Sequence, residues 1–294
     1  MTITVTSGQS GRTIRSLLHY DLGMSTALLN HLKRREGGIL LNGVPAFTNA
    51  IVAAGDQLAV DLRDDAPATP IHPIPMELDI RYEDEFLIII HKPAPLAVHA
   101  SSFAPEEPTL AGGLAHYLGP ELVFHPVNRL DRGTTGLMVV AKNRFIHNAL
   151  RQMLHTKAFY REYRGITVGI PDPPAGTVSL PIGRAEGSPI KRCVRADGAD
   201  AVTDYKTLSV VRNLALVQLV PRTGRTHQLR VHMAALGHPL AGDWLYGVED
   251  PSLIPRPALH ACLISLRHPI TGEDLTMQAG LPEDMAQLLR PQHS

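Results

Sequence analysis

The spacing of apolar residues divides the first part of the chain into short helices and strands. Residues 12–35 carry apolar side chains at helical intervals and predict two helices, the second capped by Ser25. Short apolar stretches at 39–41 and 57–62 predict strands, because each is bounded by turn residues. Residues 1–63 are therefore expected to form a small α+β unit.

Two signals mark a turn and a boundary after these elements. Asn42-Gly43 lies between apolar stretches, which is a strong signal for a β-hairpin. Residues 64–75, DDAPATPIHPIP, are rich in proline and alanine, a composition typical of a stiff linker. We therefore expect the linker to separate residues 1–63 from a second domain over residues 76–294.

The second domain mixes strand and helix patterns. Residues 214–220 are almost continuously apolar, which predicts a strand buried on both faces. Thr226 is expected to cap a helix over 227–236 that Gly237 terminates. The other expected elements are strands at 86–91, 137–141, 157–169 and 259–266, a hairpin at Thr271-Gly272, and helices at 109–118, at 143–155 and from Pro282 onward.

Composition narrows the class of protein. A chain of 294 residues can bury a large core. Its two cysteines, Cys193 and Cys262, show no CxxC spacing, which argues against a disulfide scaffold or a zinc ribbon. No secretory signal pattern opens the sequence, and the longest aliphatic run, 87–90, is too short to span a bilayer. These features predict a soluble cytoplasmic protein that does not associate with a membrane, with monomer as the default state.

Charge is segregated although the chain as a whole is neutral. Residues 77–121 contain eight acidic and two basic residues, whereas residues 125–164 contain eight basic and two acidic residues. Such a basic region can attract phosphates even in a neutral protein. The alternative is that the fold brings the two segments together, so that their charges cancel.

The loop HPVNRLDRGTTG, residues 125–136, is the richest candidate for chemistry. Asp131 lies between Arg129 and Arg132, and neighbouring cations favour the ionised carboxylate, which can act as a nucleophile without a cofactor. Thr134 adds a hydroxyl, and the flanking glycines allow tight turns. The alternative is a structural ion pair or turn before a strand.

The whole string, with the strand that follows it, resembles the catalytic motif of the RluA-type pseudouridine synthases, (H/N)RLDRxTSG followed by LLVVAK. The resemblance implies that Asp131 is the nucleophile. Two positions depart from the common pattern, Asn128 where many members have His and Gly133 where many have Asp. Neither is the nucleophile, so only the fine tuning of the site is in doubt.

A second segment of the chain resembles another motif of the same family. In KAFYREYRGITVG, Tyr163 stands six residues before Gly169 and matches the tyrosine that lies against the target base; Tyr160 is the competing choice. A phenol ring suits this task because stacking holds a base without base-specific hydrogen bonds. On residue type alone, a strand tyrosine is more often a packing residue.

A third segment, GRTHQLRVH…GHPLAGDWLYG, closely matches the family's GRTHQIRVH…GHPIxGDxxYG. The resemblance implies that Arg225 pairs with the catalytic carboxylate and orients it, the alternative being a phosphate contact or a surface ion pair. His227, Gln228 and Arg230 are expected to contact substrate, together with Arg129, Arg132 and Thr134 from the first motif. A metal is not expected, because the chain has no HExxH and His227 and His232 are poorly spaced to share one helix face.

The first sixty residues resemble the small S-four-like RNA-binding module, in which the basic end of the second helix faces RNA. Lys33, Arg34 and Arg35 occupy that end. The alternatives are a generic α+β cap and cations that the helix dipole favours in any last turn.

Similarity to the RluA-type family covers residues 77–280. It implies an α+β core on a mainly antiparallel mixed sheet, no cofactor, and isomerisation of specific uridines in structured RNA, with ribosomal RNA favoured over tRNA. Two alternatives remain: an RNA-binding protein with an inactive synthase fold, and an Asp-nucleophile hydrolase such as a glycosidase, which needs a second carboxylate, for which Asp243 is the nearest candidate.

Overall fold

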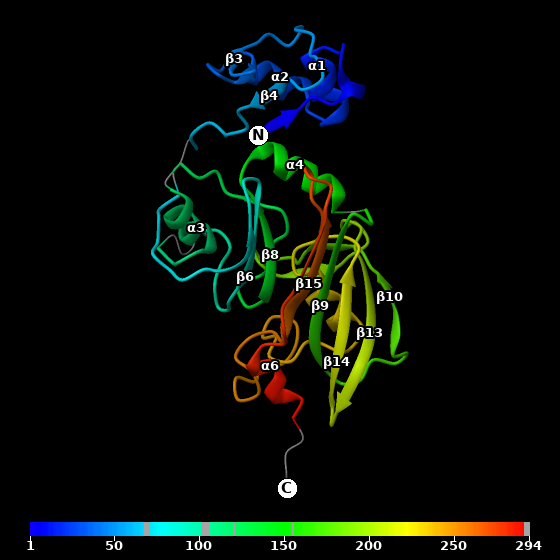
Figure 1. Cartoon of the computed structure of the whole chain (residues 1–294). Helices are drawn as coiled ribbons and strands as arrows, with labels where there is room; N and C mark the ends of the chain where they lie inside the picture. The colour runs from blue at the N-terminus through cyan, green and yellow to red at the C-terminus, as the bar shows by residue number, and fades with distance from the viewer. Residues whose placement is uncertain (68–70, 101–105, 120, 155, 291–294) are drawn as a thin grey trace.

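Two β-sheets organise the chain in the computed structural model, which describes residues 1–67, 71–100, 106–119, 121–154 and 156–290 (Figure 1). Positions 68–70 of the expected linker, and His155 at the end of the helix expected at 143–155, lie outside the described residues. The first sheet lies within the first sixty residues. The second forms the body of the molecule below it in Figure 1.

The N-terminal sheet has four strands in the order β1-β4-β2-β3, with antiparallel pairs throughout. Asn42 and Gly43 both take positive φ angles, 52° and 80°, in the turn between the second and third strands, as the hairpin signal predicts. The elements of this unit are β1 (Thr2–Thr4), a 3₁₀ turn (Ser7–Gln9), α1 (Ile14–Ser16), which continues as a π-helical turn (Leu17–Asp21), α2 (Thr26–Leu32), β2 (Ile39–Leu41), β3 (Val44–Pro45) and β4 (Gln57–Val60).

The helices of this unit form where the apolar spacing predicts them. Ser25 caps α2, because its hydroxyl accepts the backbone N–H of Leu28. Leu17, Leu29 and Leu58 are fully or almost fully buried between the helices and the sheet. Residues of the second domain, including Phe145, pack against this apolar cluster, so the two parts of the chain are in contact.

Within the described residues, the large sheet has ten strands and is mainly antiparallel, as expected. Its order is β10-β13-β14-β9-β15-β8-β6-β5, with β16 beside β15 and β7 beside β8; the β15·β8 pair is parallel. Its strands are β5 (Asp79–Glu83), β6 (Leu87–Lys92), β7 (His125–Pro126), β8 (Thr135–Ala141), β9 (Phe159–Val168), β10 (Ala175–Ser179), β13 (Val202–Val211), β14 (Leu214–Pro221), β15 (Leu259–Arg267) and β16 (Asp274–Gln278).

Short helices and one small hairpin surround the large sheet. In Figure 1, α4 lies on the side of the N-terminal unit and α6 lies at the opposite end of the molecule. These elements are α3 (Leu110–Leu118), α4 (Arg144–Met153), α5 (Gln228–Ala235), α6 (Glu283–Leu288) and the hairpin of β11 (Ile182–Arg184) with β12 (Arg192–Val194).

Strand β8 is central to the sheet and every one of its residues is buried. It begins with Thr135 and Gly136, which pair in parallel with β15. Gly136 has a φ of 113°, and a Cβ there would lie 2.2 Å from the carbonyl oxygen of Ala261. Only glycine fits at this position, which is where the loop of Asp131 enters the sheet.

Two local predictions are wrong. Strand β14 alternates between buried and half-buried residues, so one of its faces is less covered than the apolar run predicts. The residue preceding α5 is His227, in the left-handed region at φ 58°, and Thr226 does not cap the helix. Gly237 does terminate it, with a φ of 81°.

The two oppositely charged segments are partly neutralised by contact. Lys142 pairs with Glu83 at 2.7 Å, and Arg132 pairs with Glu107 at 2.9 Å. Several other arginines of the basic segment instead line a large cleft, described below.

Candidate active site

The loop that carries Asp131 connects β7 to β8, and local hydrogen bonds determine its shape. The N–H of Thr134 donates to the carbonyl of Asp131 at 3.0 Å, which closes a turn. Asn128 is buried, and its side-chain carbonyl accepts the N–H of Val139 at 2.8 Å. The loop is therefore closed by a turn and anchored to β8 through Asn128.

Two buried basic side chains hold the backbone next to Asp131. Lys92 is fully buried and donates to the carbonyls of Pro93, Leu96 and Arg132, at 2.8, 2.8 and 3.3 Å. Burial lowers the pKa of Lys92 to about 7. From the other side, Arg256 donates to the carbonyl of Gly133 at 3.2 Å. The turn that carries the carboxylate is thus held at two consecutive carbonyls, those of Arg132 and Gly133.

Arg230 is the partner of Asp131. Its Nη1 lies 3.2 Å from Oδ2 of Asp131, and the residue is buried in the first turns of α5. Arg225 was expected here, and this expectation is corrected: Arg225 is exposed, and its Nε donates to the carbonyl of Asp200 at 2.9 Å. The reason is local, because Arg225 precedes the helix whereas Arg230 lies on the face of α5 that is turned inward.

A second carboxylate holds Arg230 from its other edge. Asp243 is fully buried and accepts Nε and Nη2 of Arg230 at 2.8 and 2.7 Å, a bidentate pair. Both oxygens of Asp243 are therefore engaged by the guanidinium. This arrangement argues against Asp243 as the acid of a glycosidase.

His227 also faces Asp131. Its Nε2 lies 3.8 Å from Oδ2 of Asp131, while its Nδ1 lies 2.7 Å from the hydroxyl of Tyr246. Desolvation lowers the pKa of His227, which favours the neutral ring. A left-handed backbone at a non-glycine residue costs free energy, and such strain is concentrated at functional sites.

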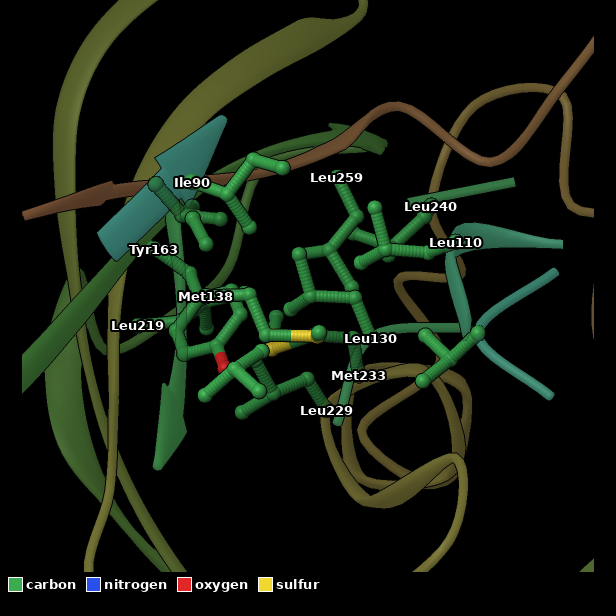
Figure 2. Close-up of a cluster of buried hydrophobic side chains, with 14 of the residues drawn as sticks. Ile90, Leu110, Leu130, Met138, Tyr163, Leu219, Leu229, Met233, Leu240 and Leu259 are labelled. Atoms are coloured by element: carbon green, nitrogen blue, oxygen red, sulfur yellow. The ribbon is translucent and has the colours of Figure 1, made fainter. Parts of the chain in front are cut away.

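Tyr163 lies in β9 and belongs to the main apolar cluster, with Met138, Leu219 and Leu229 around it (Figure 2). Its exposed fraction is 6%, and burial raises the pKa of its phenol, so the ring is neutral at physiological pH. Tyr160, the competing choice, is 37% exposed and its hydroxyl bonds Glu162. Tyr163 contributes to the wall of the same cleft as Asp131, and Tyr160 does not.

That cleft has a volume of about 1510 Å³ and extends from the large sheet to the N-terminal unit. Asp131, Tyr163 and Arg230 line it together, and so do Thr134 and Arg161. The hydroxyl of Thr134 and Nη2 of Arg161 are buried and have no hydrogen-bond partner among the described residues. A buried polar group without a partner is costly, so both atoms indicate a site that is completed by a ligand.

Arg161 lines the cleft but is not among the site residues that the sequence motifs predict. It occupies the position two residues before Tyr163 in β9, with an exposed fraction of 8%, and contributes no ion pair within the described part of the chain. The only indication of a role in the sequence is that a basic residue stands within a predicted strand. That signal is weak, because strand arginines usually point to solvent.

Of the other residues expected to contact substrate, some line the cleft and others do not. Arg129 is exposed and lines the cleft, whereas Arg132 pairs with Glu107 away from it. The side chain of Gln228 bonds the loop before α5 and strand β13, since it accepts the N–H of Arg225 and donates to the carbonyl of Val202.

The three basic residues after α2 also differ from one another. Lys33 and Arg34 are exposed. Arg35 instead pairs with Asp61 at 3.3 Å and with Asp65 at 2.6 Å.

Among the described residues, no group of His, Cys, Asp or Glu side chains has a geometry that could hold a metal ion. No helix in the described ranges combines the length and the apolar character needed to cross a bilayer.

Known proteins match most of this chain. The family described as RNA pseudouridylate synthase matches residues 86–235, a range that contains Asp131, Tyr163 and Arg230. The uncharacterized RNA pseudouridine synthase YjbO of Bacillus subtilis is 38% identical over 92% of this chain and 96% of its own. The ribosomal large subunit pseudouridine synthase D of Neisseria meningitidis serogroup A is 38% identical over 87% of this chain and 72% of its own.

A solved structure agrees with these sequence matches. The human RNA Pseudouridylate Synthase Domain Containing 4 has 30% sequence identity and a TM-score of 0.55, and the match covers 71% of this chain and 91% of the human chain.

Proposed function

This chain belongs to the family of RNA pseudouridylate synthases, enzymes that isomerise uridine in RNA to pseudouridine, and from that premise we propose that Asp131 is its nucleophile and that ribosomal RNA is its substrate. The family expected from the three sequence motifs is confirmed. One observation carries the residue assignment: the carboxylate of Asp131, held by Arg230, lines the same cleft as the ring of Tyr163.

The proposed reaction exchanges one bond of the nucleoside for another. The bond between N1 of uracil and C1′ of the ribose breaks, and a bond between C5 and C1′ forms; C5 loses its proton and N1 gains one. The target must leave its stack to reach the cleft, because a base cannot be detached and turned over inside a helix. Asp131 acts at the extruded nucleotide, and nothing is oxidised or reduced.

Each neighbouring residue has a proposed task in this cycle. Arg230 keeps the carboxylate of Asp131 oriented, and Asp243 keeps Arg230 oriented. Tyr163 presents its ring to the detached uracil. Stacking on this ring keeps the uracil in the cleft while the base turns over. The unpartnered groups of Thr134 and Arg161 are available to the extruded nucleotide, since each needs a hydrogen-bond partner that the free protein does not provide.

For the chain as a whole we propose three segments: an S-four-like RNA-binding unit over residues 1–63, a linker over 64–75, and the catalytic domain over 76–294. The exposed Lys33 and Arg34 at the end of α2 support an RNA-facing surface on the first unit. Ribosomal RNA is proposed as the substrate because the Neisseria relative is named as a ribosomal large subunit synthase.

Mapping pseudouridine in total RNA from cells with and without this protein tests the proposal. We expect specific positions in ribosomal RNA to lose pseudouridine when the protein is absent, and to regain it when the purified protein is added. Loss confined to tRNA would contradict the proposed substrate. Unchanged maps, with no product from the purified protein, would contradict the activity.

A further inference from the structure

Helix α4 carries a polar stripe along one face. Arg144, Asn148, Arg151 and Gln152 are spaced at i, i+4, i+7 and i+8, so they lie on the same side of the helix. All four are exposed, while Ile146 and Leu150 on the opposite side are fully buried. The sequence pattern alone indicates a packing helix. The structure additionally shows where the polar side faces.

The stripe lines the same cleft as Asp131. All four residues contribute to the cleft wall, and residues of α2 and of the linker also line the cleft. The stripe covers nine residues, a length of about 12 Å at 1.5 Å per residue. A ligand whose reacting part reaches Asp131 can therefore extend along α4 without leaving the cleft.

The charge balance of the cleft favours an anionic ligand. Each carboxylate in its wall has a basic partner: Asp61 and Asp65 pair with Arg35, Asp64 with His125, and Asp131 with Arg230. By contrast, Arg144 and Arg151 form no ion pair with any carboxylate in the part of the chain that the structure describes. Among the described residues, the two arginines of the stripe thus lack direct carboxylate partners, whereas the acidic residues of the cleft have basic partners.

Helix stability does not account for this arrangement. The helix dipole favours a basic residue in the last turn of a helix, and this effect is sufficient to explain Arg151. Arg144 is in the first turn, where the dipole disfavours a cation. The helix N-terminus already has its own caps, Asn143 to the N–H of Ile146 and Asp64 to the N–H of Arg144. The helix dipole and the caps therefore do not explain why the cation at Arg144 is on this face.

We propose that this stripe binds the phosphate backbone of the RNA substrate, at nucleotides beyond the extruded uridine. The inference rests on the proposed function, because it takes RNA as the ligand. Arginine binds phosphate with parallel hydrogen bonds, and the interleaved amides of Asn148 and Gln152 supply donors and acceptors for phosphate and 2′-hydroxyl groups. The stripe reads no sequence; it positions the RNA relative to Asp131.

The double variant Arg144→Gln/Arg151→Gln tests the proposal, with unmodified ribosomal RNA transcript as the probe. We expect the Kd and the KM for the transcript to rise about tenfold, with kcat within twofold of the wild type. The slope of log Kd against log salt should fall by about 1 to 2, because two phosphate contacts are lost. A circular dichroism spectrum and a melting curve establish that the variant is folded.

Lys206→Gln/Arg290→Gln is the matched control, because it removes the same charge from exposed residues that do not line the cleft. We expect the control to leave Kd and the salt slope unchanged. Equal effects of the two double variants, or no effect of the first, would overturn the proposal. If Arg144→Gln/Arg151→Gln does not fold, Asn148→Ala/Gln152→Ala takes its place, and we expect it to raise Kd with an unchanged salt slope.

The outcomes separate this inference from the proposed function. If the wild type forms pseudouridine in the transcript and the stripe variant binds as tightly as the wild type, only the stripe is wrong. If the wild type forms no pseudouridine in any RNA yet loses affinity when the stripe is changed, the stripe is right and the proposed function is wrong.

Discussion

Asp243 binds Arg230 through Nε and Nη2, at 2.8 and 2.7 Å, and leaves Nη1 free to contact Asp131 at 3.2 Å. The guanidinium is therefore oriented by a carboxylate that is fully buried, before any substrate enters. A rigid, planar donor held in this way orients the reactive carboxylate at little cost in side-chain entropy. Lysine, a flexible point charge, would not do the same.

Replacing Arg230 should affect both activity and stability. We expect Arg230→Gln to lower kcat at least a hundredfold, because Asp131 loses its partner. It should also destabilise the fold by about 3–5 kcal/mol, because Asp243 is left buried and unpaired. Arg225→Gln should change kcat less than tenfold, since Arg225 contacts the carbonyl of Asp200. Pseudouridine formation rates and denaturant melts measure both effects, and a larger kcat loss for Arg225→Gln would contradict the geometry.

A second variant separates the two consequences of losing Arg230. In Arg230→Met/Asp243→Leu the buried charge is removed together with its partner, so we expect most of the stability to return. Activity should remain lost, because Asp131 still lacks a guanidinium. Recovery of both properties together would show that Arg230 serves only the fold.

Arg161 should show a conflict between stability and function. Its Nη2 is buried without a partner, so Arg161→Met is expected to raise the melting temperature of the free protein. The same change should reduce kcat/KM at least tenfold, because the extruded nucleotide loses a donor. Arg164→Met, on the same strand but paired with Glu162, is the comparison, and we expect it not to raise the melting temperature. A less stable but fully active Arg161→Met protein would contradict this assignment.

The C-terminal helix should influence catalysis from a distance. Asp284 binds Arg256 at 2.7 and 2.8 Å, and Arg256 donates to the carbonyl of Gly133 beside Asp131. We expect Asp284→Ala to lower kcat about tenfold with little change in KM. Without Asp284, Arg256 is no longer held in position to bond the turn that carries Asp131. Glu283→Gln, an exposed neighbour in the same helix, is the control and should behave as the wild type. A rise in KM with unchanged kcat would contradict the proposal that Asp284 positions Asp131 through Arg256.

His260 should make stability depend on pH. It is fully buried, its Nδ1 lies 2.9 Å from the hydroxyl of Thr135, and burial lowers its pKa to about 4 from 6.5. Between these values the unfolded state binds more protons than the folded state, so stability falls as the pH drops from 6.5 to 4. The contribution is on the order of 3 kcal/mol. In His260→Gln, the free energy of unfolding should fall less between pH 6.5 and pH 4 than in the wild type, as measured by denaturant melts at several pH values. The same fall in both proteins would contradict this role of His260.

Local signals in the sequence were enough to place most elements. Ser25, the Asn42-Gly43 pair and Gly237 act through neighbouring backbone groups, so their positions are readable from a few residues. The apolar run of β14 was misleading about burial, because whether the second face of a strand is covered depends on what packs there. The start of α5 was misplaced because His227 takes a backbone conformation that its residue type rarely adopts.

The candidate site was predictable as a set of segments and not as a set of contacts. Asp131, Tyr163 and the segment of α5 were identified from motifs, but the choice between Arg225 and Arg230 depends on which way the chain faces as it enters the helix. Asp243 becomes a partner only through tertiary packing. The apolar spacing of residues 143–155 predicts a packing helix and assigns no role to its polar face, because the N-terminal unit that lines the same cleft is distant in sequence.

The central claim, that the carboxylate of Asp131 performs the reaction, is tested most directly by Asp131→Asn. This change keeps the size of the side chain and an acceptor for Arg230 while removing the nucleophilic oxygen. The measurement is tritium release from RNA labelled at C5 of uridine, because that hydrogen is lost when the new carbon–carbon bond forms. We expect a folded protein that binds RNA like the wild type and releases no tritium above background. Release at a rate near that of the wild type would contradict the account.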